Sequence, residues 1–395
     1  MPHSSSSTST SILQKPFPSP TLSLSHRIVL APMTRMRACN TTALPNPTAA
    51  PYYAERTTPG ALLISEGIVI HPRGKGFPRT PGLWTPAHAE AWKPITDAVH
   101  ARGGTFFAQI WHVGRVSVPS QTGGLRPLSS TSGCLPGRHV LFGQSEDADG
   151  DGDVSEAYGP SHALSIPKIQ DVVGQFARAA RLAVHGGGFD GVEIHGGNGY
   201  LVDCFTHDSI NTRGDEYGGS IGNRIRFALE VVDAVVRAVG RERTAIRLAP
   251  YHVLQGTNDS MRLETFSELV RELEMRGLAY VHIVEPRYDR FSREGAFSGD
   301  IRRDGDGRED ADEASIWSFR RILKTTPVIG AGGYDAESAA RAIEEGRVDL
   351  VAFGRYFTSN PDLPERLFKG LPLTKYHRPT FYTSGEKGYL GWPRW

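Results

Sequence analysis

One stretch, residues 191–205, brings together three polar side chains of different chemistry. A short apolar run leads into a glycine-rich turn that carries His195, Asn198 and Tyr200. An imidazole and an amide can both donate hydrogen bonds to one oxygen atom. A tyrosine hydroxyl, with a reference pKa of ~10, can hand over a proton while staying neutral at pH 7. Two donors and a proton source are what the addition of hydrogen across an activated double bond requires.

His195 considered alone does not indicate catalysis, because a histidine is often a hydrogen-bonded core residue or a metal ligand. The turn offers no second histidine or carboxylate at metal-ligand spacing, which argues against a metal. The acidic segment 147–153 resembles the first half of a calcium loop, but its twelfth position is Tyr158 rather than glutamate. We therefore expect no metal site, and the joint occurrence of the three polar residues favours a catalytic turn.

Three further polar residues stand within or directly after apolar runs. Arg247 lies in the run 244–250, where a buried guanidinium needs an anionic or electron-rich partner; over a flavin ring it would stabilise the negative charge of the reduced form. Gln109 can both donate to and accept from the edge of a heteroaromatic ring. Thr34 could bond a ring carbonyl. A structural salt bridge is the alternative for Arg247, and a turn cap is the alternative for Thr34.

Two glycine-containing runs near the end of the sequence are typical of a phosphate site. They end in Gly332-Gly333 and in Gly354-Arg355. Glycine turns can direct backbone N–H groups at phosphate oxygens, and an arginine can bind them with two parallel hydrogen bonds. Plain turn glycines are the alternative, and any phosphorylated ligand would fit such a site.

The elements that must position these residues alternate regularly between strand and helix. Helical patterns are predicted over 88–102, 165–185, 220–239, 262–276, 314–324 and 335–346. The strand runs are apolar throughout, which predicts a parallel sheet covered on both faces. A TIM (β/α)8 barrel is favoured over a doubly wound open sheet, because it would bring the polar residues at the strand ends to one mouth. The predicted strands are 26–33, 61–70, 105–112, 192–194, 244–250, 280–286, 327–333 and 349–355.

The chain is expected to form one domain. Residues 1–20, which begin with a Ser/Thr-rich stretch without an apolar core, are predicted to be a disordered tail, and residues 21–395 to be the barrel. Residues 117–165 are rich in Gly, Ser, Pro and Asp. So long a connection inside a compact domain is usually functional or disordered, so we expect an inserted lid over one mouth after the third strand.

Composition excludes several classes of protein. The 44 basic and 43 acidic residues leave a net charge of +1, so nucleic acid is not an expected partner. No run approaches the ~18 apolar residues of a membrane span. Three widely spaced cysteines fit neither a disulfide framework nor a zinc site, and a cytoplasmic location is expected. Neither a P-loop nor a Rossmann glycine fingerprint occurs.

Several segments of the sequence, taken in order, resemble those of a known protein family. From about residue 26 to residue 393 it resembles the old yellow enzyme family of FMN-dependent ene-reductases. That resemblance implies a TIM barrel in which NADPH or NADH reduces FMN and leaves, and an enone or enal then binds and is reduced. The segments that carry it are 26–38, 107–115, 191–205, 211–227, 246–251, 284–291, 353–367 and 378–382.

The resemblance also implies roles for individual residues. His195 and Asn198 would hold the substrate carbonyl, Tyr200 would donate the proton, and Trp111 and Tyr382 would line the substrate pocket. The protein would be a monomer or a homodimer. Gly333 stands where many relatives have asparagine, although a backbone N–H suffices for phosphate. The residues that would hold FMN are Pro32, Met33, Thr34, Gly67, Gln109, Arg247, Gly332, Gly333, Gly354 and Arg355.

Two other functions remain open at this level. A flavin-free barrel, such as an aldolase or isomerase of a phosphorylated substrate, would explain the phosphate loops. It would not explain Arg247, Gln109 and Thr34 together, and it would need a lysine or carboxylate at a strand end. A barrel that only binds a ligand is disfavoured by the intact catalytic turn.

Overall fold

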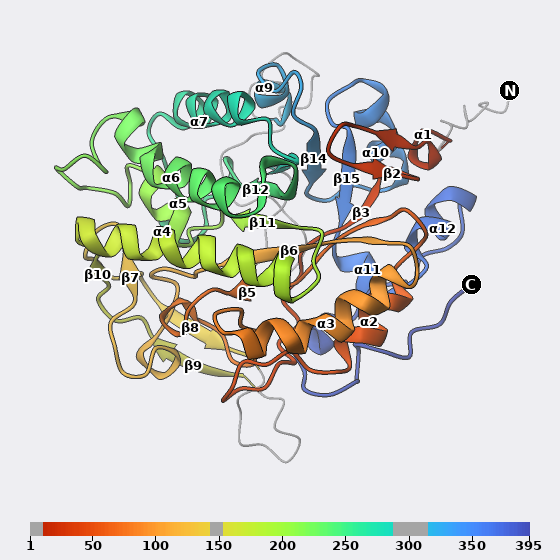
Figure 1. Ribbon diagram of the computed structural model, residues 1–395, viewed down its shortest axis with the longest axis horizontal. Coiled ribbons are helices and arrows are strands. Elements are labelled where there is room, and N and C mark those ends of the chain that lie inside the picture. Colours follow the sequence, from red (N-terminus) through yellow and green to blue (C-terminus); the bar gives the residue numbers. More distant parts are fainter. Residues whose placement is uncertain (1–10, 143–152, 287–314) are drawn as a thin grey trace, which may run out of the picture.

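The described part of the chain forms a closed barrel of parallel strands. The computed structural model describes residues 11–142, 153–286 and 315–395 (Figure 1). Neighbouring barrel strands pair in parallel, and the ring closes where β11 (Gly191–His195) pairs with β6 (Thr105–Trp111). The predicted barrel is therefore confirmed, and the open sheet is excluded. The eight strands in ring order are β3 (Ile28–Leu30), β4 (Leu62–Ile64), β6 (Thr105–Trp111), β11 (Gly191–His195), β12 (Thr244–Leu248), β13 (Tyr280–Val284), β14 (Val328–Ala331) and β15 (Leu350–Phe353).

Amphipathic helices cover the outside of the barrel (Figure 1). Their apolar faces pack with the outward side chains of the strands in one continuous core. Helix α6 (Ile221–Val239), the longest within the described residues, is capped by Ser220, whose hydroxyl accepts the Asn223 N–H at 3.3 Å, and is followed by Gly240, whose φ of 93° suits glycine. The covering helices include α2 (Ala49–Glu55), α3 (Pro86–His100), α4 (Ile166–Arg181), α6 (Ile221–Val239), α7 (Arg262–Arg276), α10 (Ala336–Glu344) and α12 (Leu363–Lys369).

A small hairpin closes the end of the barrel opposite the carboxyl ends of the strands. Strand β1 (Phe17–Pro18) pairs with β2 (Ser23–Leu24), and Phe17, Leu22 and Leu24 join the interior cluster. Helix α1 (Ser11–Gln14) precedes it, and the Leu13 side chain is 0% exposed. The predicted disorder therefore does not extend to residues 11–20, because these apolar side chains are buried; residues 1–10 lie outside the described residues.

Two predicted elements differ from the structure. The run 61–70 divides into β4 and a short β5 (Ile68–Val69), and at the break the backbone N–H of residue 66 donates to a side chain instead of to a neighbouring strand. The Glu66 N–H donates to the Tyr53 hydroxyl at 2.8 Å, and the Glu66 carboxylate accepts the Arg35 N–H at 3.1 Å. The helix predicted over 314–324 is only the short α9 (Trp317–Arg320).

The segment 117–165 forms two small two-stranded sheets. Strand β7 (Leu128–Ser129) pairs in parallel with β10 (His162–Ala163), and β8 (Arg138–Leu141) pairs in antiparallel with β9 (Val154–Ala157). Apolar side chains of this segment share a cluster with Trp111 and Tyr200. The Phe142 ring lies 4.5 Å from the ring of Tyr382. The segment therefore packs against the mouth that bears the predicted site, and its role as a lid stays a prediction; residues 143–152 lie outside the described part.

Two buried arginines hold a segment that follows the last barrel strand. We call residues 378–389 the strap. Arg35 donates to the carbonyl oxygens of Phe381 at 3.2 Å and Gly388 at 2.9 Å. Arg37 donates to those of Phe381 at 3.0 Å, Gly385 at 2.9 Å and Lys387 at 2.9 Å. Charged donors make strong hydrogen bonds, so the strap is fixed against the barrel mouth.

Acid is expected to weaken the fold through His26, which precedes β3. Its Nδ1 accepts the Ile28 N–H at 3.2 Å, and its Nε2 lies 2.7 Å from the Thr58 hydroxyl, so the bonded ring is neutral. Burial lowers the pKa of His26 to about 4. Because the folded protein binds this proton less readily than the unfolded chain does, protonation favours unfolding. We expect the free energy of unfolding to be highest above the ordinary histidine pKa of ~6.5 and to fall by up to about 3 kcal/mol as the pH is lowered from 6.5 through 4.

Urea unfolding at a series of pH values measures this loss. A His26→Gln protein should be less stable at pH 7 but should lose less stability between pH 6.5 and 4 than the parent. The matched control is His185→Gln, which changes an exposed histidine and should keep the parent's acid dependence. An equal acid dependence in the parent and His26→Gln would rule out this role.

Candidate active site

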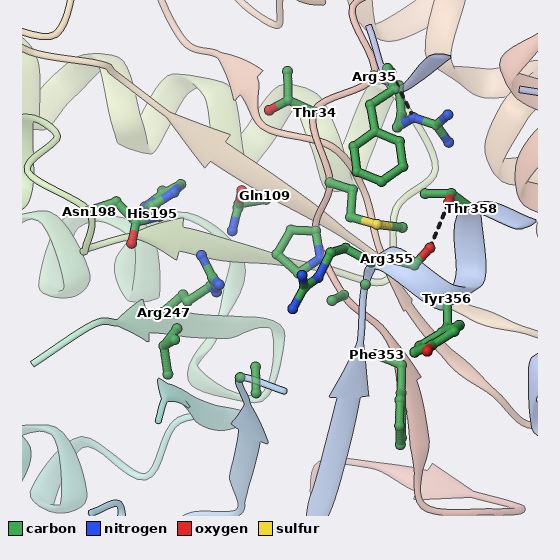
Figure 2. Close-up of a pocket in the computed structure, with 18 of the residues that line it drawn as sticks. Thr34, Arg35, Gln109, His195, Asn198, Arg247, Phe353, Arg355, Tyr356 and Thr358 are labelled. Carbon is green, nitrogen blue, oxygen red and sulfur yellow. Dashed lines mark hydrogen bonds between the residues drawn. The ribbon is translucent and has the colours of Figure 1, made fainter. Parts of the chain in front are cut away.

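A cavity of about 450 Å³ opens at the carboxyl ends of the barrel strands. Figure 2 shows Gln109, His195 and Arg247 facing a common space from neighbouring strands, with Arg355 on another side of it. The structure thus brings together residues that are far apart in the sequence. The predicted site residues that line the cavity are Pro32, Met33, Thr34, Gln109, Trp111, His195, Asn198, Tyr200, Arg247, Gly332, Gly333, Gly354, Arg355 and Tyr382.

The turn that carries His195, Asn198 and Tyr200 forms one wall of the cavity. His195 is the last residue of β11 and pairs in register with Arg247. The Tyr200 ring stands almost perpendicular to the His195 ring, with 4.8 Å between their centroids, and lies 4.9 Å from the Trp111 ring. Asn198 has a φ of 62°, a left-handed conformation that asparagine tolerates better than most residues. One wall therefore presents two hydrogen-bond donors and a hydroxyl to the cavity.

A buried carboxylate fixes this turn from behind. Asp203, on helix α5 (Leu201–Thr206), accepts the Gly199 N–H at 2.8 Å through Oδ2. Its Oδ1 lies 3.0 Å from His207 Nε2, and both side chains are fully buried. This pair was not predicted from the sequence; the spacing of four residues on one helix face was the available indication. Cys204, between them, is buried, and burial raises its thiol pKa to about 11, which is typical of an inert packing residue.

The opposite end of the cavity is suited to a phosphate group. Gly332 and Gly333 have φ values of 120° and 83°, which side chains rarely adopt. A Cβ at Gly332 would lie 3.1 Å from the Glu285 carbonyl oxygen, a crowded contact that adds to the backbone strain of its positive φ and favours glycine. Arg355 donates to the Tyr376 hydroxyl at 3.1 Å, which steadies its guanidinium at the cavity edge. Backbone N–H groups and a guanidinium are the donors that phosphate oxygens prefer.

Gly67 is the one predicted cofactor residue that is not among those lining the cavity. It packs instead against the face of Trp111, which does line the cavity. A Cβ on Gly67 would lie 2.5 Å from Trp111 Cε3, and real contacts of that length essentially never occur. The structure therefore gives Gly67 a packing position that allows Trp111 to reach the cavity, while direct contact between Gly67 and the cofactor stays a prediction.

Gly67→Ala is expected to destabilise the protein by about 1–3 kcal/mol, because the added methyl group displaces the Trp111 ring within a buried cluster. Urea unfolding followed by tryptophan fluorescence measures both effects. Gly133→Ala is the matched control, since no atom lies within 4 Å of its added Cβ. A Gly67→Ala protein as stable as Gly133→Ala would show that Trp111 has free room.

The donor set fits FMN from end to end. A flavin ring has carbonyl oxygens, ring nitrogens and one N–H along its pyrimidine edge, and Thr34, Gln109 and Arg247 offer a hydroxyl, an amide and a cation around the cavity. The phosphate of FMN matches the Gly332–Gly333 turn and Arg355. A parallel barrel with such a mouth defines a class: FMN-dependent oxidoreductases of the TIM-barrel type.

Comparison with known proteins identifies the family. The model of the "NADH:flavin oxidoreductase / NADH oxidase family" matches residues 13–374, and the chain belongs to this family. It is 42% identical over 383 residues to 12-oxophytodienoate reductase 2 of Arabidopsis thaliana, covering 96% of this chain and 95% of the relative. It is 40% identical over 381 residues to flavin oxidoreductase hxnT of Emericella nidulans, covering 94% of each.

Solved structures agree with this result. Morphinone reductase superimposes with a TM-score of 0.86 at 37% identity, covering 97% of this chain and 96% of the other. The old yellow enzyme homologue of Zymomonas mobilis gives 0.84 at 37% identity, covering 96% and 99%. The predicted membership of the old yellow enzyme family is confirmed, as are FMN and a nicotinamide as cofactors. No helix within the described residues has the length and apolar character needed to span a membrane.

Proposed function

We propose that this protein reduces the carbon–carbon double bond of α,β-unsaturated carbonyl compounds, with NADPH or NADH as the hydride source, in a ping-pong sequence. The observation that carries the proposal is the wall formed by His195, Asn198 and Tyr200. It presents two donors for one oxygen and a proton source to a cavity that also fits FMN. When bound, FMN would supply the hydride for this reduction.

His195 and Asn198 bind the carbonyl oxygen of the substrate. Negative charge grows on this oxygen as hydride arrives, so two fixed donors stabilise the transition state more than the ground state. Donors of this kind contribute about 3–4 kcal/mol each at comparable sites. Tyr200, which packs against both His195 and Trp111, delivers a proton to the α-carbon.

The remaining cavity residues orient the two ligands. Arg247 and Thr34 bind the polar part of the flavin ring together with Gln109. The phosphate group is bound at Gly332, Gly333, Gly354 and Arg355, and Pro32 and Met33 line the same side. Trp111 and Tyr382 bound the space left for the substrate, and Phe142 of the segment 117–165 supports the Tyr382 ring. The names of two relatives, 12-oxophytodienoate reductase and morphinone reductase, denote ketones, which supports an enone as substrate.

The flavin-free alternative finds no support in the cavity. Aldolases and isomerases of phosphorylated substrates commonly use a lysine nucleophile or a carboxylate base, although a histidine can also serve as a base. Among the described residues that line the cavity there is neither a lysine nor a carboxylate. The phosphate-binding end is explained equally well by FMN.

An absorbance experiment tests the proposal. The purified protein should be yellow, anaerobic NADPH or NADH should bleach it, and cyclohexenone should restore the colour. Titration with each nicotinamide determines which one is used, and a panel of enones and enals determines the substrate class. A colourless protein that cannot be reconstituted with FMN would sink the proposal, as would a reduced flavin that no enone or enal reoxidises.

A further inference from the structure

A carboxylate is buried inside the barrel beside Gln109. Glu193 lies on β11 two residues before His195, so both side chains face the barrel interior. It pairs in register with Gln109 on β6 and with Ala245 on β12, and its side chain is 0% exposed. The adjoining interior is apolar, so an isolated charge here would be costly. Its presence calls for specific partners.

Glu193 contacts polar side chains on both sides, and the pKa of the buried Tyr280 hydroxyl is raised by burial and by the nearby Glu193 carboxylate. Gln109 Nε2 donates to Glu193 Oε1 at 2.7 Å. The other oxygen, Oε2, lies 2.9 Å from Nδ1 of His282, which is also fully buried. Burial lowers the pKa of His282, so its ring is neutral at pH 7. Because a carboxylate only accepts, the ring proton sits on Nδ1 and is donated to Glu193.

The contact with Glu193 determines which end of the Gln109 amide reaches the cavity. An amide turned the other way would place its carbonyl oxygen against a carboxylate oxygen, and the two acceptors would repel each other. With Nε2 engaged by Glu193, Oε1 is the group left for the cavity that Gln109 lines. At this point the cavity therefore offers a ligand a hydrogen-bond acceptor. The pyrimidine edge of a flavin carries one N–H, which could donate to it.

We propose that Glu193 is a positioning residue for the flavin, which fixes Gln109 as an acceptor for the ring N–H and places a negative charge beside the polar end of the site. This charge opposes that of Arg247, whose strand neighbour in register is His282. A negative charge disfavours the addition of electrons to a nearby ring, so Glu193 lowers the reduction potential of bound FMN. The inference rests on the proposed assignment of Gln109 to the flavin edge and is independent of the substrate that is reduced.

Two variants separate charge from orientation. Glu193→Gln keeps the shape and removes the charge, so the midpoint potential of bound FMN should become more positive. Glu193→Leu removes the hydrogen bond to Gln109, and FMN should bind to the apoprotein about two- to tenfold more weakly. Fluorescence titration of the apoprotein with FMN and a redox titration of the holoprotein measure these effects without any substrate.

A remote buried carboxylate provides the control. Asp362, which precedes α12, bonds to Arg366 at 2.8 Å and is buried like Glu193. Asp362→Asn should leave both the potential and the FMN affinity unchanged. An unchanged potential in Glu193→Gln, or an unchanged affinity in Glu193→Leu, would overturn the inference. Thermal unfolding of each variant separates loss of the fold from loss of binding.

Gln109→Leu distinguishes the inference from the assignment on which it rests. It should weaken FMN binding about as much as Glu193→Leu does, and the double variant should bind no more weakly than either single variant, since both changes remove one interaction. Loss of affinity in Gln109→Leu without any effect of the Glu193 changes would reject the inference alone. An unaltered affinity in Gln109→Leu would reject the assignment as well.

Discussion

Tyr200→Phe is expected to slow the reduction of an enone by about 10²–10⁴-fold, the usual contribution of a general acid, while the nicotinamide reduces the flavin at its normal rate. The ring of phenylalanine keeps the perpendicular contacts with His195 and Trp111, so only the hydroxyl is lost. Anaerobic stopped-flow spectroscopy at the flavin band measures the two half-reactions separately.

The loss of a hydroxyl elsewhere provides the control for this change. Tyr217 bonds to Glu230 at 3.0 Å and is not among the residues that line the cavity, so Tyr217→Phe should leave both half-reactions unchanged. Equal enone reduction in Tyr200→Phe and the parent would remove Tyr200 from the role of proton donor. A fall in both half-reactions would indicate a damaged site instead.

Removal of either carbonyl donor is expected to lower kcat for the enone by about 10²–10³-fold. His195→Ala and Asn198→Ala each leave one donor on the wall of the cavity. Because both donors serve one oxygen atom, the loss in the double variant should be smaller than the product of the two single losses. Steady-state kinetics with saturating nicotinamide provide the measurement.

The backbone of Asn198 requires a second substitution at this position. Its φ of 62° is a conformation that alanine adopts at a cost of about 1–2 kcal/mol, whereas glycine adopts it freely. Asn198→Gly therefore removes the amide without straining the turn. If the amide is the important group, Asn198→Gly should be as slow as Asn198→Ala. Near-normal turnover in Asn198→Gly would assign the effect to the turn and contradict the donor role.

The sequence predicts the barrel well because each strand has a recognisable local pattern of residues. A strand covered on both faces must be apolar throughout, and a polar residue at its carboxyl end stands out against that background. Arg247 within the run 244–250 and His195 after its apolar run were found in this way, and the structure places both on the cavity.

Residues that act through a neighbour distant in the sequence have no such local pattern, so their roles could not be predicted. Glu193 was not predicted as a site residue, because it lies in a run that its apolar neighbours identify as a buried strand. Its spacing of two residues from His195 nevertheless places both side chains on the same face of that strand. The close contact of Gly67 with Trp111 was not predicted, because it depends on how β5 and β6 pair. The order within residues 11–20 was missed because it depends on Leu13 and Phe17 reaching cores built from distant segments.

The strap has a consequence for how the protein is made. Phe381 and Tyr382 line the cavity, yet they are translated after all eight barrel strands, the last of which ends at Phe353. All eight barrel strands are therefore synthesised before this part of the cavity lining. Until then, the carbonyl groups of the strap that Arg35 and Arg37 bind in the complete protein have not been synthesised. Loading with FMN is accordingly expected to be a late event, which follows the emergence of residues 378–389 from the ribosome.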